Sequence, residues 1–193
     1  GKTGAAMVRA AHDRQREVVL HVPMEPINYP QVNPGPGTLL VTLRPAKIGN
    51  EVGRWLDQAK PVVAVANHMG SLATQDMTLM TAVYRELKRR RVPFLHLMPA
   101  AGAVCRPLAS EMGVAYDEPG ATLDFEPRAL DTAPMDKRWR QVLKETRDRG
   151  RMIVWVRATP TTWRWLKKAL DPKRLDRVDL VPLTSLLRKP GPA

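Results

Sequence analysis

The sequence is poor in cysteine, in aromatic side chains and in long apolar runs. Its single cysteine, Cys105, cannot form an internal disulfide, which excludes a disulfide scaffold and predicts a small side chain packed among apolar neighbours. No stretch approaches ~18 consecutive apolar residues, so no membrane span is expected. Residues 1–11 also lack the apolar core of a secretory signal. Any targeting segment is therefore expected to have been removed or not to be included in the sequence.

Acidic residues are in the minority, with 19 Asp and Glu against 31 Lys and Arg and a formal net charge of +12. This charge favours an anionic partner, whether nucleic acid, anionic lipid or an acidic protein; the alternative is a solvated basic surface. Because aromatic residues make up 5% and no stacking motif is present, we expect charge-driven docking to a larger protein or RNA–protein assembly rather than recognition of bases. The candidate partner-binding residues are Arg89, Arg90, Arg91, Lys167 and Lys168.

The length and the pattern of apolar residues predict one α/β domain. The 193 residues are 44% hydrophobic and 26% charged, which is ordinary for a globular domain. Short β-branched runs alternate with segments of helical spacing, and this alternation is typical of parallel βαβ units. Asn50 is expected to cap the helix that follows it. Strands are expected at 17–21, 61–67, 93–98, 152–157 and 178–183, and helices at 5–16, 52–59, 77–87, 104–112, 139–146 and from 159 onward.

Two short phrases lie where apolar strands end: HVPMEP at residues 21–26 and NHMGS at residues 67–71. In α/β folds, ligands and catalytic groups gather at the carboxyl ends of parallel strands. His21 and His68 therefore indicate a common site. The alternative is that each histidine is a core or capping residue, which is the more frequent role of a lone histidine at a strand end.

These phrases, with Tyr29-Pro30 and NPGPGTLL at 33–40, resemble the divergent polysaccharide deacetylase family, a branch of the NodB-type carbohydrate deacetylases. The resemblance continues in order through almost the whole chain. It implies a distorted, incomplete (β/α) barrel forming a single domain over residues 1–187, followed by a basic, proline-rich tail at 188–193. It also implies that the sequence begins inside this fold, after the first strand.

The chemistry that the resemblance implies is metal-dependent removal of acetyl groups from N-acetylated polysaccharide. A divalent metal, most often zinc, polarises the amide carbonyl and activates a water. On this basis His21 and His68 are the candidate metal ligands, and Glu25, Asn67 and Ser71 are the candidate catalytic residues. Glu25 is expected to be the acid–base carboxylate or a carboxylate that supports the metal ligands, and Asn67 and Ser71 to orient the bound group or the metal ligands. The alternatives are that Ser71 caps the following helix and that Glu25 holds its own loop through backbone N–H groups.

The sequence departs from the family pattern at several points. It lacks the Asp-Asp pair of the NodB-type enzymes, it has His96-Leu97-Met98 where many relatives have Asp-Ser-Arg, and it has Val156-Arg157 where many have Gly-His. His96 is expected to be a buried neutral histidine. Beside Glu25, Asp124 is the other acid that we nominate for the site. These departures predict an impaired or inactive site.

Two functions follow from these observations. The first is a pseudoenzyme that serves as a basic accessory subunit of a larger assembly, for which an organellar ribosome or a respiratory complex of the mitochondrion is one setting. The second is an active metal-dependent deacetylase of the bacterial periplasm or envelope. An enzyme requires His21 and His68 to converge near a carboxylate, whereas a recruited subunit requires its basic stretches to contact another molecule.

Overall fold

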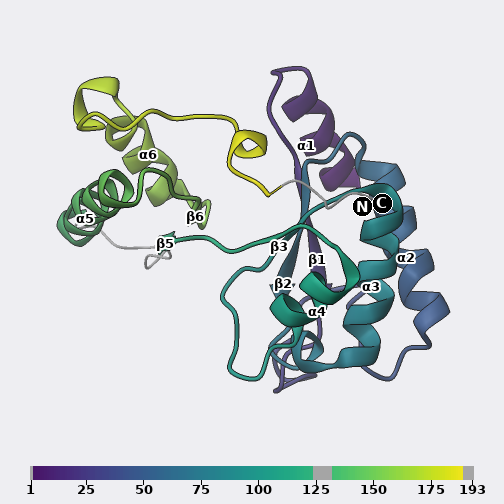
Figure 1. The fold of residues 1–193 in the computed structure, drawn as a ribbon. Helices are drawn as coiled ribbons and strands as arrows, with labels where there is room; N and C mark the ends of the chain where they lie inside the picture. The colour runs from purple at the N-terminus through teal and green to yellow at the C-terminus, as the bar shows by residue number, and fades with distance from the viewer. Residues whose placement is uncertain (1, 124–131, 189–193) are drawn as a thin grey trace. The chain divides into compact units, whose positions relative to one another are not determined.

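The computed structural model describes residues 2–123 and 132–188 (Figure 1). The chain divides into two compact units, a first unit of Gly1–Glu118 with Leu187–Ala193 and a second unit of Pro119–Leu186, and each is described by itself. The single domain expected over 1–187 stays a prediction. Of the expected tail, Arg188 lies among the described residues and 189–193 lie outside them.

The first unit is built on a parallel sheet with the strand order β1-β2-β3-β4. Each strand is followed by a segment that returns the chain to the start of the next one, as right-handed βαβ crossovers require. Figure 1 shows α2 and α3 side by side along this sheet. The elements are α1 (Lys2–His12), β1 (Val19–Met24), α2 (Pro45–Ala59), β2 (Ala64–Met69), the short 3-10 helix η1 (Ala73–Gln75), α3 (Met77–Arg90), β3 (Phe94–Leu95), α4 (Cys105–Met112) and β4 (Tyr116–Asp117).

The core of the first unit lies between one face of the sheet and the helices α2, α3 and α4. Val22 and Met24 of β1 and Val65 of β2 are fully buried in this core. Since side chains alternate between the faces of a strand, the residues between them point to the other face. That face carries His21 and His68, and it is the face on which the sequence predicts a site.

The second unit pairs two parallel strands and packs two helices on them. Its core centres on Trp139 and Trp165, whose rings meet edge to face with centroids 6.0 Å apart. Thr159 opens the last long helix with a capping box, as the Thr-Pro start predicts. The elements are β5 (Ala121–Leu123), α5 (Ala133–Arg149), β6 (Val154–Val156), α6 (Pro160–Ala169), η2 (Pro172–Arg174) and η3 (Leu183–Ser185).

The structure confirms the α/β class, and the described strands form two parallel sheets rather than one closed ring. Cys105 is buried in the core of the first unit, as expected. The expected strand at 178–183 is wrong, because this segment forms no strand and leaves Leu180 and Val181 exposed. The expected cap at Asn50 is also wrong, since α2 begins five residues earlier at Pro45. No helix in the described ranges has the length and apolarity needed to cross a bilayer.

Candidate functional site

His21 and His68 lie on one face of the sheet, on adjacent strands. In the parallel register His21 stands opposite Ala66, and His68 stands opposite Pro23, so the two histidines are two residue positions apart along the strands, with the pair Val22–Asn67 between them. Both residues are exposed. Loss of hydration around the His21 ring lowers its pKa below the ordinary value of an imidazole, and the neighbouring His68 lowers the pKa further. The structure therefore brings these two predicted residues together.

Glu25 lies just beyond β1 and fastens the loop that follows. Its carboxylate Oε2 accepts a hydrogen bond from the backbone N–H of Val41 at 2.7 Å. Its own backbone N–H donates to the carbonyl of Leu39, and its carbonyl accepts from the N–H groups of Leu72 and Ala73. These are the loop-holding contacts that the sequence offered as the alternative to an acid–base role.

Asn67 is 3% exposed and joins the end of β2 to the segment after β3. Its amide group donates to the carbonyls of Met69 at 2.8 Å and Leu97 at 2.9 Å, and its Oδ1 accepts from the N–H of Leu97 at 2.7 Å. Both donor positions of the amide are thus used by the backbone. The proposed orienting role of Asn67 stays a prediction, and the side chain has a clear structural one.

Ser71 links the NHMGS phrase to the residue that follows HVPMEP, because its Oγ accepts a hydrogen bond from the N–H of Ile27 at 3.0 Å. The helix-cap alternative for Ser71 is wrong, since Asp76 caps α3 by accepting from the N–H of Leu79 at 2.7 Å. Ser71 and Glu25 therefore fasten the segments that carry the HVPMEP and NHMGS phrases to each other. The side chains of Glu25, Asn67 and Ser71 are more strongly tied to the backbone than the sequence suggests.

Gly70 lets the chain turn where β2 ends. Its φ is +90°, in the region that L side chains rarely adopt, and a Cβ atom placed there would lie 2.8 Å from the Cβ of Met24. The preceding Met69 also has a positive φ of 59°. Glycine is required at this position both by the backbone angle and by the close approach to β1.

His96 lies on the helix-facing side of the sheet and takes no part in the His21–His68 face. It is 1% exposed, its Nδ1 lies 2.9 Å from the Tyr116 hydroxyl, and Tyr116 in turn donates to Glu118. Its Nε2 has no hydrogen-bond partner among the residues that the structure describes. The expected burial of His96 is confirmed, and this burial lowers its pKa to about 4, which favours the neutral ring. No pattern in the sequence indicated the Tyr116–Glu118 pair.

A carboxylate that sequence reasoning missed, Asp117 of β4, lies in the same row of the sheet as His21, through Ala66 and Leu95. Three strand spacings separate the two side chains, which is about 14 Å. Asp117 is 8% exposed and accepts a hydrogen bond from the backbone N–H of Arg188 at 2.6 Å. It is therefore too far away to join the histidines in one ligand set.

The described residues bring two imidazoles together, but they place no third ligand beside them that would form a metal site. Within 2–123 and 132–188, no group of three His, Cys, Asp or Glu side chains lies close enough together to hold a metal ion. Asp124, the other nominated acid, lies outside the described residues. We therefore derive no metal-dependent step from this arrangement.

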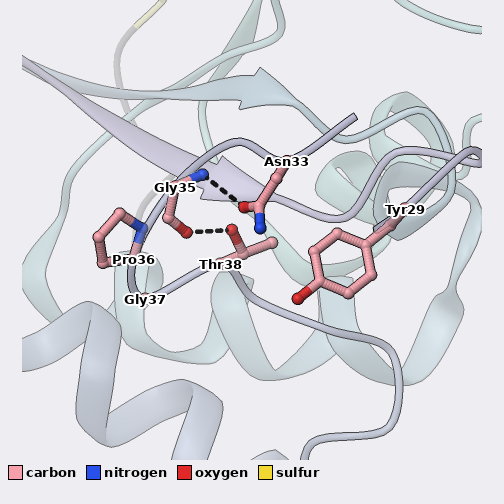
Figure 2. A pocket seen from close by; sticks show the side chains of 6 residues that line it. All are labelled: Tyr29, Asn33, Gly35, Pro36, Gly37 and Thr38. Atoms are coloured by element: carbon pink, nitrogen blue, oxygen red, sulfur yellow. Dashed lines mark hydrogen bonds between the residues drawn. The ribbon is translucent and has the colours of Figure 1, made fainter. Parts of the chain in front are cut away.

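The loop after β1 borders an open pocket of about 450 Å³, lined by Tyr29, Asn33, Gly35, Pro36, Gly37 and Thr38 (Figure 2). Two hydrogen bonds inside the loop shape it. The Asn33 Oδ1 accepts from the N–H of Gly35 at 2.8 Å, and the Thr38 hydroxyl donates to the carbonyl of Gly35 at 2.6 Å. The sequence marked this loop as part of the resemblance but did not predict a pocket in it.

The sequence and fold define a member of a carbohydrate-deacetylase family. The profile of the family described as divergent polysaccharide deacetylase matches residues 1–187, and the chain belongs to this family. This confirms the resemblance on which the candidate site rests. Family membership establishes the class of the domain.

The relatives are uncharacterized proteins. One from Haemophilus influenzae is 24% identical over 152 residues, covering 79% of this chain and 52% of the relative. Uncharacterized protein YibQ of Escherichia coli is 26% identical over 188 residues, covering 95% of this chain and 56% of YibQ. The chain thus spans about half the length of these curated relatives. A crystal structure of an uncharacterized protein from Agrobacterium tumefaciens matches with a TM-score of 0.81 and 22% identity, covering 92% of this chain and 71% of that one, which shows the shared fold.

Proposed function

We propose that this chain is a polysaccharide-binding domain of the divergent deacetylase family. It binds its glycan, and Glu25, Asn67 and Ser71 do not hydrolyse it. The observation that carries this proposal is that the candidate catalytic side chains are engaged in hydrogen bonds to the backbone. Glu25, Asn67 and Ser71 each direct polar atoms to backbone groups that tie the ends of β1, β2 and β3 together. Family membership supplies the class of ligand, an acetylated polysaccharide.

The face that carries His21 and His68 suits the binding of sugar hydroxyl groups. A neutral imidazole has one N–H donor and one acceptor nitrogen, so each ring can bond a hydroxyl in either sense. The lowered pKa of His21 favours this neutral form. The net charge of +12 supports the further proposal that the domain is a basic accessory part of a larger assembly with an anionic component.

The setting that we propose is the bacterial envelope, where acetylated polysaccharide is abundant. The relatives reported above come from bacteria, which favours this setting over the organellar ribosome or respiratory complex that the charge alone also allowed.

A second candidate, metal-dependent deacetylation, is favoured by one observation: His21 and His68 lie on the same face and interact electrostatically. Two imidazoles leave positions for a carboxylate and a water on a tetrahedral metal ion. In this case the third ligand would come from outside the described residues, and the chain's own contribution would be the two imidazoles of His21 and His68 on adjacent strands.

One experiment separates the two candidates. Divalent metal content is measured by elemental analysis in the purified chain and in a His21→Ala/His68→Ala double variant, and both are incubated with N-acetylglucosamine oligomers while acetate is followed. We expect the unaltered chain to bind the oligomers without acetate release, the double variant to bind them more weakly, and the metal content to be low and equal in the two proteins. Near-stoichiometric metal that is lost in the double variant, together with acetate release by the unaltered chain, would establish the hydrolase instead.

A further inference from the structure

We propose that the pocket in the loop after β1 binds one N-acetylated sugar ring, with the acetamido group held by Asn33 and Thr38. This inference rests on the proposed function, because it names the part of the domain that takes the acetylated sugar. The volume of about 450 Å³ lies within the ~300–1,000 Å³ range of small-ligand sites. The pocket belongs to a loop, where binding residues are often placed on a rigid scaffold.

The pocket is shaped before any ligand arrives. Gly37 has a φ of +83°, and a Cβ atom placed there would lie 3.2 Å from the Cζ2 atom of Trp55, so the loop backbone rests against α2. Leu39, which follows the pocket, pairs with Met24 at the end of β1. The carboxylate of Glu25 holds the next turn through Val41. A loop fixed in this way has less ordering entropy to lose on binding.

The hydrogen bonds inside the loop decide which polar atoms remain for a ligand. Because the Asn33 Oδ1 accepts from Gly35, its Nδ2 group is left as a donor. Because the Thr38 hydroxyl donates its hydrogen to Gly35, its oxygen is left as an acceptor. An acetamido group offers a carbonyl acceptor and an N–H donor, which is the complementary pair.

Tyr29 adds the apolar surface that a sugar ring needs. Figure 2 shows its phenol ring beside the turn that carries Thr38, with the hydroxyl directed toward that turn. A tyrosine combines a large apolar ring face, which can pack on the C–H groups of a pyranose, with a polar hydroxyl at one end. No charged side chain lines the pocket. A sugar carrying a free ammonium group therefore finds no counter-charge there, and we expect selection for the acetylated form.

The test uses the full chain and two probes, the tetramer of N-acetylglucosamine and the fully deacetylated tetramer, in calorimetric titrations. The key variant is Asn33→Asp, which keeps the acceptor oxygen for Gly35 but removes the amide donor. Its matched control is Asn28→Asp, which introduces the same charge at an exposed position of the same loop that does not line the pocket. Tyr29→Ala is a second variant, and circular dichroism checks that each protein is folded.

We expect the unaltered chain to prefer the acetylated tetramer. Loss of one hydrogen bond in Asn33→Asp should weaken binding of the acetylated tetramer about three- to tenfold. Loss of the aromatic ring in Tyr29→Ala should weaken it at least about fivefold, and Asn28→Asp should leave it unchanged. Binding that is equally tight in Asn33→Asp, Tyr29→Ala and the unaltered chain would overturn the pocket while leaving glycan binding intact. Absence of binding by the unaltered chain would overturn the proposed function and the pocket together.

Discussion

At the scale of single residues, His96 couples the stability of the fold to pH. Its folded pKa of about 4 lies below the ordinary value of 6.5, because burial opposes the charged form. As pH falls below 6.5, His96 takes up a proton in the unfolded chain before it does so in the folded chain. The contribution of the neutral ring to the free energy of unfolding is therefore fully present above pH 6.5 and is lost as the pH falls toward 4. The loss across this window is roughly 3 kcal/mol from the difference in the pKa of one group.

Replacement of His96 by Phe should remove this pH dependence. The variant keeps a ring in the core beside Phe94 and leaves Tyr116 bonded to Glu118, so it should fold. We expect urea unfolding of the unaltered chain to show a stability that declines between pH 6.5 and 4 more steeply than that of His96→Phe. Equal slopes in the two proteins would contradict the assignment of this proton uptake to His96.

Gly70 gives a second prediction at this scale. Gly70→Ala places a methyl group 2.8 Å from the Cβ of Met24 at a φ of +90°, and we expect a loss of about 2–3 kcal/mol in the free energy of unfolding. Gly49→Ala is the control, because it lies inside α2 with nothing within 4 Å of the added carbon. The control should gain about 0.5–1 kcal/mol. Equal effects of the two substitutions in thermal unfolding would contradict the role given to Gly70.

At the scale of elements, the sequence predicts best where local chemistry and packing agree. The apolar spacing before the arginine run is found as α3, Gly113 ends α4 in a left-handed conformation, and Thr159 caps α6. Prediction fails where one local signal competes with another. Asn50 is a good cap by type, but Pro45 starts α2 earlier because proline is well suited to the first turn. The strand expected at 93–98 is found as the shorter β3, and β4, which was not predicted, has two residues, too few for a periodic pattern.

The candidate site was only partly predictable for a related reason. Strand ends in a parallel sheet share one edge, so the meeting of His21 and His68 follows from the sequence. The partners of Glu25, Asn67 and Ser71 do not follow from it, because these side chains bond to backbone groups of segments distant along the chain. Backbone groups carry no residue-specific signal. The pocket at 29–38 was equally invisible, since it depends on how one loop folds on itself.

The cap of α3 is the prediction that belongs to this scale. Asp76 accepts from the N–H of Leu79 at 2.7 Å, and it precedes the helix whose first residues lie just after the NHMGS turn. Asp76→Ala should lower the free energy of unfolding by about 1 kcal/mol, while Asp76→Ser, which keeps a capping oxygen, should change it much less. Equal stability of the two variants in chemical denaturation would show that the side-chain cap contributes little to α3.

At the scale of the whole molecule, the charge of +12 is not equally available on the two basic stretches. Arg90 bonds to Glu86 and to Asp57 of α2, and its side chain is 18% exposed. Arg89 also bonds to Glu86. Lys167 instead lies 5.2 Å from the ring centroid of the exposed Trp163. Arg89 and Arg90 are thus paired with carboxylates within the first unit, whereas the lysines of α6 have no carboxylate partner among the described residues.

An anionic partner should therefore depend more on the lysines of α6 than on the arginines of α3. We expect Lys167→Gln/Lys168→Gln to elute from immobilised heparin at a clearly lower salt concentration than the unaltered chain, because each lost contact reduces counterion release. Arg89→Gln/Arg90→Gln removes the same formal charge and should elute closer to the unaltered chain, since Glu86 and Asp57 already oppose those guanidinium groups. If the two double variants lost the same retention, net charge alone would govern the binding, and the intramolecular pairing of the arginines would have no bearing on which surface meets the partner.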